Sequence, residues 1–201
     1  MPVATETSLV DALPALRERC ERELATLATP TCRRGCSACC EHLVPVAPAE
    51  LRRLRGVVEA LPAGERARLR RRFASARLQL MKAHLWDLLE DAAVAPPEEQ
   101  AWLASSYRSA RVPCPFLDDG ECSIYDERPL ACRLQAVTSD PAECHKSRGK
   151  VVPLRLPGRP PVKALAELEG GTWSPLVCLR DGGYESEVAG DWEERFGDAR
   201  R

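Results

Sequence analysis

The chain has 201 residues, of which 44% are hydrophobic, 29% charged and 5% aromatic, and its formal net charge is −1 at pH 7. This length predicts one domain, or one domain with an appendage, and the balanced charge excludes a global electrostatic attraction to nucleic acid or to an anionic membrane. A core with few rings must consist mainly of Leu, Val and Ala, which favours an additional staple. The ten cysteines are the candidates for this role.

The N-terminus and the hydropathy pattern decide how these cysteines are interpreted. Residues 1–20 include Glu6, Asp11, Arg17 and Glu18 and contain no apolar run as long as that of a signal peptide. No stretch approaches the roughly 18 apolar residues of a membrane span. We therefore expect a cytoplasmic protein that does not contact a membrane and whose thiols stay reduced. Clustered cysteines in such a protein indicate metal ligands rather than disulfides.

The apolar pattern predicts a mainly α-helical fold: a small helical protein with a loop-rich segment stapled by cysteines and metal. Apolar residues recur every three or four positions in the first segment, which places Cys20 in a buried stripe. The longest helix has a wide apolar face that includes His84 and Leu88. Helices are predicted over residues 8–28, 48–60, 63–92, 98–107 and 162–169, and an extended stretch over 43–46.

Composition along the chain suggests three parts. Residues 1–29 form an N-terminal amphipathic helix. Residues 30–150 form a cysteine-cluster metal-binding domain that includes the long helices of residues 48–107. Residues 151–201 begin with a proline-rich linker and continue as an acidic C-terminal extension.

The first cysteine group is compact. Cys32, Cys36, Cys39 and Cys40 follow the pattern C-x3-C-x2-C-C. Either a helix or a tight turn at Gly35 would gather these four thiols, and soft thiolates suit zinc or an iron–sulfur cluster. A buried helix stripe that happens to use cysteine is the alternative, but the intervening arginines, glycine and serine are poor core residues.

The second cysteine group is dispersed. Its members are separated by 7, 9 and 11 residues, which suits a loop-rich segment whose thiols reach back to the first group; they are Cys114, Cys122, Cys132 and Cys144. Prolines stiffen the segment, and Gly120 predicts a tight turn between its first two cysteines. A helical turn is expected near residues 127–135 with Asp126 as its cap. The alternative interpretation is that these are scattered buried cysteines without a metal, and this alternative is strongest for Cys144.

Three strings of residues resemble a known family. These are Cys-Ser-Ala-Cys-Cys at 36–40, Pro-Cys-Pro-Phe-Leu at 113–117 and Gly-Glu-Cys-Ser-Ile-Tyr-Asp-Glu-Arg-Pro-Leu-Ala-Cys-Arg at 120–133. Together they look like the YkgJ-type cysteine-cluster family, also described as the zinc- or iron-chelating CxxCxxCC domain, over about residues 30–145. Three residues separate Cys32 from Cys36 where the family's name has two. The resemblance implies metal binding by the pooled cysteines and names no substrate.

The metal and its ligand set are left open in part. The cofactor is expected to be an iron–sulfur cluster, with 4Fe-4S favoured, or zinc. Eight thiols would suffice for two four-cysteine sites, and a single cluster that uses four to six of them is preferred. Ile124 and Tyr125 are expected to cover the metal, while Arg128 and Arg133 are expected to donate to sulfurs or to pair with acidic neighbours. Further possible ligands are His42, His145 and Cys178.

Three functions remain compatible with such a site, and the sequence does not decide whether the protein is an enzyme. The first is a metalloprotein that acts as an accessory, storage or electron-transfer module. The second is an enzyme or enzyme subunit of protein modification, because related clusters occur in flagellin lysine N-methylases. The third is a structural zinc protein that binds a protein partner. Residues 51–82 carry a net charge of +8 but only Phe73 as an aromatic residue, so a solvated face is preferred over a nucleic-acid site.

Overall fold

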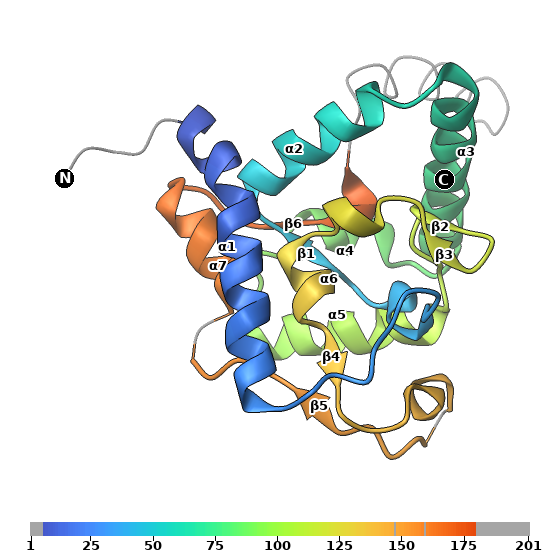
Figure 1. Cartoon of the computed structure of the whole chain (residues 1–201). Coiled ribbons are helices and arrows are strands. Elements are labelled where there is room, and N and C mark those ends of the chain that lie inside the picture. Colours follow the sequence, from blue (N-terminus) through green and yellow to red (C-terminus); the bar gives the residue numbers. More distant parts are fainter. Residues whose placement is uncertain (1–5, 147, 159, 180–201) are drawn as a thin grey trace, which may run out of the picture.

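Helices dominate the computed structural model, which describes residues 6–146, 148–158 and 160–179. The mainly α-helical fold class is therefore confirmed (Figure 1). The helices are α1 (Glu6–Leu27), α2 (Pro48–Glu59), α3 (Ala63–Lys82), α4 (Trp86–Glu90), α5 (Pro97–Ala110), α6 (Leu130–Leu134) and α7 (Pro161–Leu168). Four 3-10 turns lie between or after them: η1 (Ala38–Glu41), η2 (Tyr125–Glu127), η3 (Pro141–His145) and η4 (Leu176–Cys178).

The described residues include three short antiparallel strand pairs, two of which join segments that are far apart in the chain. Strand β1 (Pro45–Val46) pairs with β6 (Ser174–Pro175), β2 (Leu117–Asp118) with β3 (Glu121–Cys122), and β4 (Ala136–Val137) with β5 (Pro153–Leu154). The extended stretch expected over residues 43–46 is thus reduced to a two-residue strand. Because β6 pairs with β1, the last described segment lies beside the residues that follow the first cysteine group.

The apolar stripes of the helices meet in one main cluster of buried side chains. Leu13 and Cys20 of α1 are 0% and 5% exposed, which confirms Cys20 as a core residue. They pack with Leu80, Leu103 and other side chains from α3, α4, α5, α6 and α7. A second cluster joins α2 and α3 to the β2–β3 hairpin and includes Leu54, Leu69, Phe116 and Leu176. The cysteine loops lie between and beside these clusters.

The single helix expected over residues 63–92 is interrupted. Helix α3 ends at Lys82, and His84 has a φ of +56°. The His84 N–H donates to the carbonyl of Met81, and the Leu85 N–H donates to that of Leu80, which is the Schellman pattern that ends a helix. His84 and Leu88 are consequently exposed, so their predicted burial was wrong. The turn was missed because His84 takes the place that glycine usually occupies.

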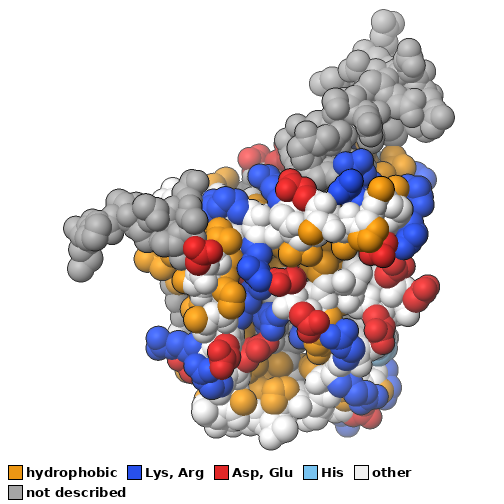
Figure 2. Space-filling model, turned by 45° about the horizontal axis from the view of Figure 1, so that its top comes forward, with side chains coloured by type: hydrophobic (Ala, Val, Ile, Leu, Met, Phe, Trp, Pro, Cys, Tyr) orange, Lys and Arg blue, Asp and Glu red, His pale blue; other side chains and the backbone are white. Residues whose placement is uncertain are grey.

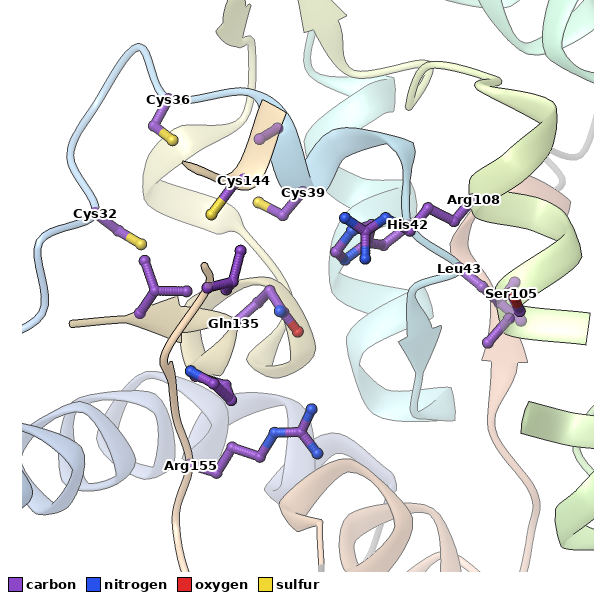
Figure 3. A pocket seen from close by; sticks show the side chains of 15 residues that line it. Cys32, Cys36, Cys39, His42, Leu43, Ser105, Arg108, Gln135, Cys144 and Arg155 are labelled. Atoms are coloured by element: carbon purple, nitrogen blue, oxygen red, sulfur yellow. The ribbon is translucent and has the colours of Figure 1, made fainter. Parts of the chain in front are cut away.

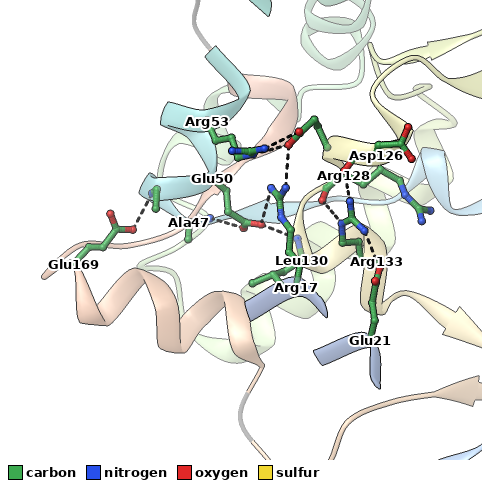
Figure 4. Close-up of polar contacts among 12 residues, drawn as sticks. Arg17, Glu21, Ala47, Glu50, Arg53, Asp126, Arg128, Leu130, Arg133 and Glu169 are labelled. Carbon is green, nitrogen blue, oxygen red and sulfur yellow. Dashed lines mark hydrogen bonds and ion pairs between the residues drawn. The ribbon is translucent and has the colours of Figure 1, made fainter. Parts of the chain in front are cut away.

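A buried carboxylate ties α1, α2 and the second cysteine segment together (Figure 4). Glu50 is 0% exposed and accepts hydrogen bonds from the backbone N–H groups of Leu130 (2.7 Å) and Ala47 (3.3 Å). Arg17 places its Nη2 3.9 Å from Glu50 and its Nη1 3.1 Å from Glu127. Burial raises the pKa of Glu50, although the two N–H donors and Arg17 oppose this shift. Glu50 thereby fixes the start of α6, which carries Cys132.

The basic segment of α2 and α3 finds acidic partners elsewhere in the fold. Arg53 pairs with Glu127 at 2.7 Å, Arg72 with Asp118 at 2.9 Å, and Arg52 with Glu169. On the face that Figure 2 shows, basic and acidic side chains lie interspersed. The acidic tail that was expected to neutralise this segment lies outside the described residues. Of the helices that the structure describes, none is both long and apolar enough to cross a membrane.

Candidate metal centre

A tight turn, rather than a helix, gathers the first cysteine group. Gly35 has a φ of +83°, which favours glycine, and the Cys36 N–H donates to the carbonyl of Arg33 at 3.1 Å. Cys39 and Cys40 follow in η1, which opens with a hydrogen bond from the Cys40 N–H to the carbonyl of Ser37 at 2.9 Å. Of the two conformations that the spacing allowed, the structure therefore has the turn.

The second cysteine group comes from four different elements. Cys114 follows α5, Cys122 lies in β3, Cys132 in α6 and Cys144 in η3. Asp119 and Gly120 have φ values of +47° and +80°, as a two-residue hairpin turn requires, so the turn predicted at Gly120 is confirmed. The Cys114 N–H donates to the carbonyl of Cys40 at 2.7 Å, which joins the two cysteine segments directly.

Asp126 does not cap a helix. The expected turn over residues 127–135 consists of η2 and α6, and α6 begins after Pro129 without a side-chain cap. The Asp126 carboxylate instead pairs with Arg34 of the first cysteine segment at 3.3 Å. Glu50 instead accepts a hydrogen bond from the Leu130 N–H at the N-terminus of α6. No local sequence pattern predicts this contact.

The eight predicted cysteines line two neighbouring cavities. A small inner cavity of about 40 Å³ is lined by Cys40, Cys114, Cys122 and Cys132, which we call the inner thiols. A larger outer cavity of about 560 Å³ is lined by Cys32 and Cys144, which we call the outer thiols (Figure 3). Cys36 and Cys39 line both cavities. The packing of η1 against η3 brings Cys144 to this place.

The two cavities differ in their surroundings. Apolar side chains from the second core cluster enclose the inner cavity, among them Phe116, Ile124 and Leu176. Tyr125 also lines it and lies between two arginines, with the guanidinium carbons of Arg128 and Arg34 at 3.8 and 4.1 Å from its ring centroid. Ile124 and Tyr125 therefore line the same cavity as the inner thiols, and their expected role in covering a metal stays a prediction.

Burial and contact with neighbouring thiols shift the pKa values of several cysteines. The Cys40 thiol donates a hydrogen bond to Cys39, which lowers the pKa of Cys39 to about 7 and raises that of Cys40. Burial raises the pKa of Cys114 to about 12 and also raises that of Cys132. Burial thus favours the protonated thiols of Cys114 and Cys132, and a metal must displace these protons because the thiolate is the ligand.

The donor set fits a thiophilic metal, although the side chains are not already closed around one. All ten cysteines are free of disulfides. Within residues 6–146, 148–158 and 160–179, no three His, Cys, Asp or Glu side chains are arranged to hold a metal ion as they stand. Reduced thiols from both cysteine segments nevertheless line shared cavities, and thiolates are the ligands that zinc and iron–sulfur clusters use.

The two arginines of the second motif have structural contacts. Arg128 donates from Nε to the carbonyl of Tyr125 at 3.2 Å, and its charge lowers the pKa of Cys122 against the larger effect of burial. Arg133 donates to the carbonyl of Arg128 at 2.8 Å and pairs with Glu21 of α1 at 2.8 Å. The acidic partner of Arg133 is thus on α1 rather than in its own segment.

The three weaker ligand candidates lie at different distances from the site: one lines a cavity and two do not. His42 lines the outer cavity and is half-buried, and burial lowers its pKa. His145 is exposed and lines neither cavity. Cys178 packs against the main core cluster. Sequence reasoning missed Arg108 and Arg155, which line the outer cavity, because α5 and the segment after β5 carry no motif.

Comparison with known proteins supports this site. A model of the CxxCxxCC family, described as a "putative zinc- or iron-chelating domain", matches residues 31–152. The chain belongs to this family. The CxxCxxCC match includes all eight cysteines that line the two cavities and excludes Cys20 and Cys178. Searches of curated proteins and of solved structures found no match.

Proposed function

We propose that the protein binds an iron–sulfur cluster, with 4Fe-4S favoured, or zinc through its pooled cysteine thiolates. The observation that carries this proposal is the convergence of eight thiols from two distant segments on two cavities that share Cys36 and Cys39. Membership in the zinc- or iron-chelating family supports it. With its ligands in both segments, the metal would add to the apolar packing of Phe116 and Ile124 in holding these loops together.

The arrangement supports two neighbouring groups of thiols better than a single one. The side chains of the adjacent residues Cys39 and Cys40 divide between the cavities, since Cys40 lines only the inner one. The inner thiols are enclosed by apolar side chains, as in a structural site, whereas the outer thiols border open space. A redox or catalytic centre needs such access, and a structural zinc site does not. This contrast favours a centre with more than a structural role.

Lysine modification is not favoured by the outer cavity. Its lining contains Arg108 and Arg155 and, among the described residues, no carboxylate. A lysine side chain would meet two arginines there and no carboxylate to pair with, which is electrostatically unfavourable. We therefore propose a metal-binding function without extending it to that reaction.

The test is anaerobic purification followed by an absorption spectrum and metal analysis of the same sample. Iron with equivalent sulfide and a brown colour would support an iron–sulfur centre, and stoichiometric zinc in a colourless protein would support the zinc alternative. Protein that holds neither metal after anaerobic reconstitution would overturn the proposal. Cys40→Ser is expected to lose metal, whereas Cys178→Ser, which changes a cysteine outside both cavities, is expected to keep it.

A further inference from the structure

The outer cavity is large enough for a ligand of its own. Its volume of about 560 Å³ lies within the range of about 300–1,000 Å³ that is usual for small-molecule sites. The first cysteine segment forms one wall, α5 contributes Ser105 and Arg108, and the strands β4 and β5 with the residues after them contribute Gln135 and Arg155.

The charged residues of the lining are all of one sign. Arg108 and Arg155 line the cavity without any aspartate or glutamate. Neither arginine has an ion pair with the described residues, whereas Arg111, at the end of the same helix as Arg108, pairs with Glu41 at 2.5 Å. The two guanidinium groups therefore contribute positive charge to the cavity and have no carboxylate partner in the part of the chain that the structure describes.

The two cations reach the cavity from different walls. Figure 3 shows the Arg108 head group beside His42 and the Arg155 head group apart from it, beyond Gln135. A guanidinium binds a carboxylate through two parallel hydrogen bonds, so each arginine can engage one carboxylate. Ser105 and Gln135 supply further hydrogen-bonding groups at the same surface. Two separated cations match a molecule with two anionic ends better than one with a single charge.

We propose that the outer cavity binds a small organic dicarboxylate, with one carboxylate on Arg108 and the other on Arg155, next to Cys32, Cys36, Cys39 and Cys144. This site goes beyond the proposed metal binding and uses residues that belong to neither cysteine motif. A metal at the outer thiols would then have a ligand or substrate beside it. The competing role for the arginines is to offset the negative charge of thiolates, without binding any anion.

The test is isothermal titration of the full-length, metal-containing protein at low ionic strength with succinate, glutarate and adipate, and with acetate as the single-charge reference. At least one dicarboxylate is expected to bind at least tenfold more tightly than acetate. Arg108→Gln and Arg155→Gln are each expected to weaken that binding at least tenfold without changing metal content. Arg71→Gln is the matched control, because Arg71 is an exposed arginine of α3 that lines none of the cavities described here.

Each contrary outcome has a separate meaning. Dicarboxylates that bind no more tightly than acetate, or an equal loss of affinity in Arg71→Gln, would overturn the proposal. Loss of metal in Arg108→Gln and Arg155→Gln, with no anion binding by the wild type, would assign the arginines to thiolate charge instead. The two proposals can fail separately. If the protein takes up no metal on reconstitution but still binds a dicarboxylate in this titration, metal binding is refuted and the dicarboxylate site stands.

Discussion

Replacement of Glu50 tests whether a buried carboxylate outside the cysteine motifs holds the metal-binding loops in place. Glu50→Ala would leave the N–H groups of Leu130 and Ala47 without their acceptor. It would also leave the Arg17 Nη2, which has no hydrogen bond within the described residues, without the carboxylate that lies 3.9 Å away. Since Glu50 is 0% exposed, water cannot replace these contacts without opening the structure.

The expected cost follows from these losses. Each buried N–H without an acceptor costs about 1–3 kcal/mol, and removal of one partner of a buried ion pair costs about 3–5 kcal/mol. Because the losses overlap, we expect Glu50→Ala to lower the free energy of unfolding by about 3–5 kcal/mol. Glu50→Gln keeps one acceptor oxygen and the side-chain volume, so its cost should be smaller.

Urea unfolding followed by circular dichroism measures this difference, and metal analysis of the same variants measures its effect on the site. Metal content should fall in Glu50→Ala because Leu130 begins the helix that carries Cys132. Glu21→Ala is the control, since its side chain is 42% exposed and it makes a surface ion pair worth less than about 1 kcal/mol. A Glu50→Ala protein within about 1 kcal/mol of the wild type would refute the reasoning.

The same carboxyl has a defined pH signature. Burial raises the pKa of Glu50 above its ordinary value of 4.5, so the folded protein holds this proton to higher pH than the unfolded chain. The contribution of Glu50 to stability is therefore fully present below that ordinary value and is lost as pH rises through the folded pKa. We expect the stability of the wild type relative to Glu50→Gln to fall as the pH rises above about 4.5. A rise over this range in urea titrations would contradict the prediction.

Three further predictions concern the core, an ion pair and the metal. Phe116→Ala should cost about 3–5 kcal/mol in urea unfolding, because Phe116 is 0% exposed and packs edge-on against Phe73 at 5.5 Å; a cost below about 1 kcal/mol would contradict its core role. The hydrogen bond from Arg53 lowers the pKa of Glu127. The wild type should therefore lose more stability than Glu127→Gln as the pH falls below about 4.5, and an equal loss in the two proteins would refute this prediction. Metal removal, or Cys39→Ser, should speed hydrogen exchange in residues 30–46 and 112–145 together; faster exchange in only one segment would argue against shared ligands.

Local patterns predicted the helices well where side chains repeat along one face. The stripe of α1 was visible because Leu13, Cys20 and Leu24 recur at helical spacing and are all buried. The hairpin turn at Gly120 was visible because glycine readily adopts the positive φ that such a turn requires. The break after α3 was not visible, since the apolar pattern runs through it and His84 carries the positive φ instead of glycine.

The candidate site was likewise predicted only in part from the sequence. The two cysteine groups and their relation to a metal-binding family follow from residue types and spacing, because metal ligands must be thiols, imidazoles or carboxylates. Spacing could not show which thiols share a cavity. That depends on the hydrogen bond between Cys114 and Cys40 and on the packing of η1 against η3, which join residues far apart in the chain.

The sequence by itself thus determined the helical class, the family and the eight candidate ligands, because periodicity and ligand chemistry are properties of neighbouring residues. Only the tertiary structure decided that Glu50 supports α6, that the thiols line an inner and an outer cavity, and that Arg108 and Arg155 both line the outer one. These features arise from contacts between segments that are remote in sequence. Their energies depend on burial and on the proximity of charges, which appear only when the chain has folded.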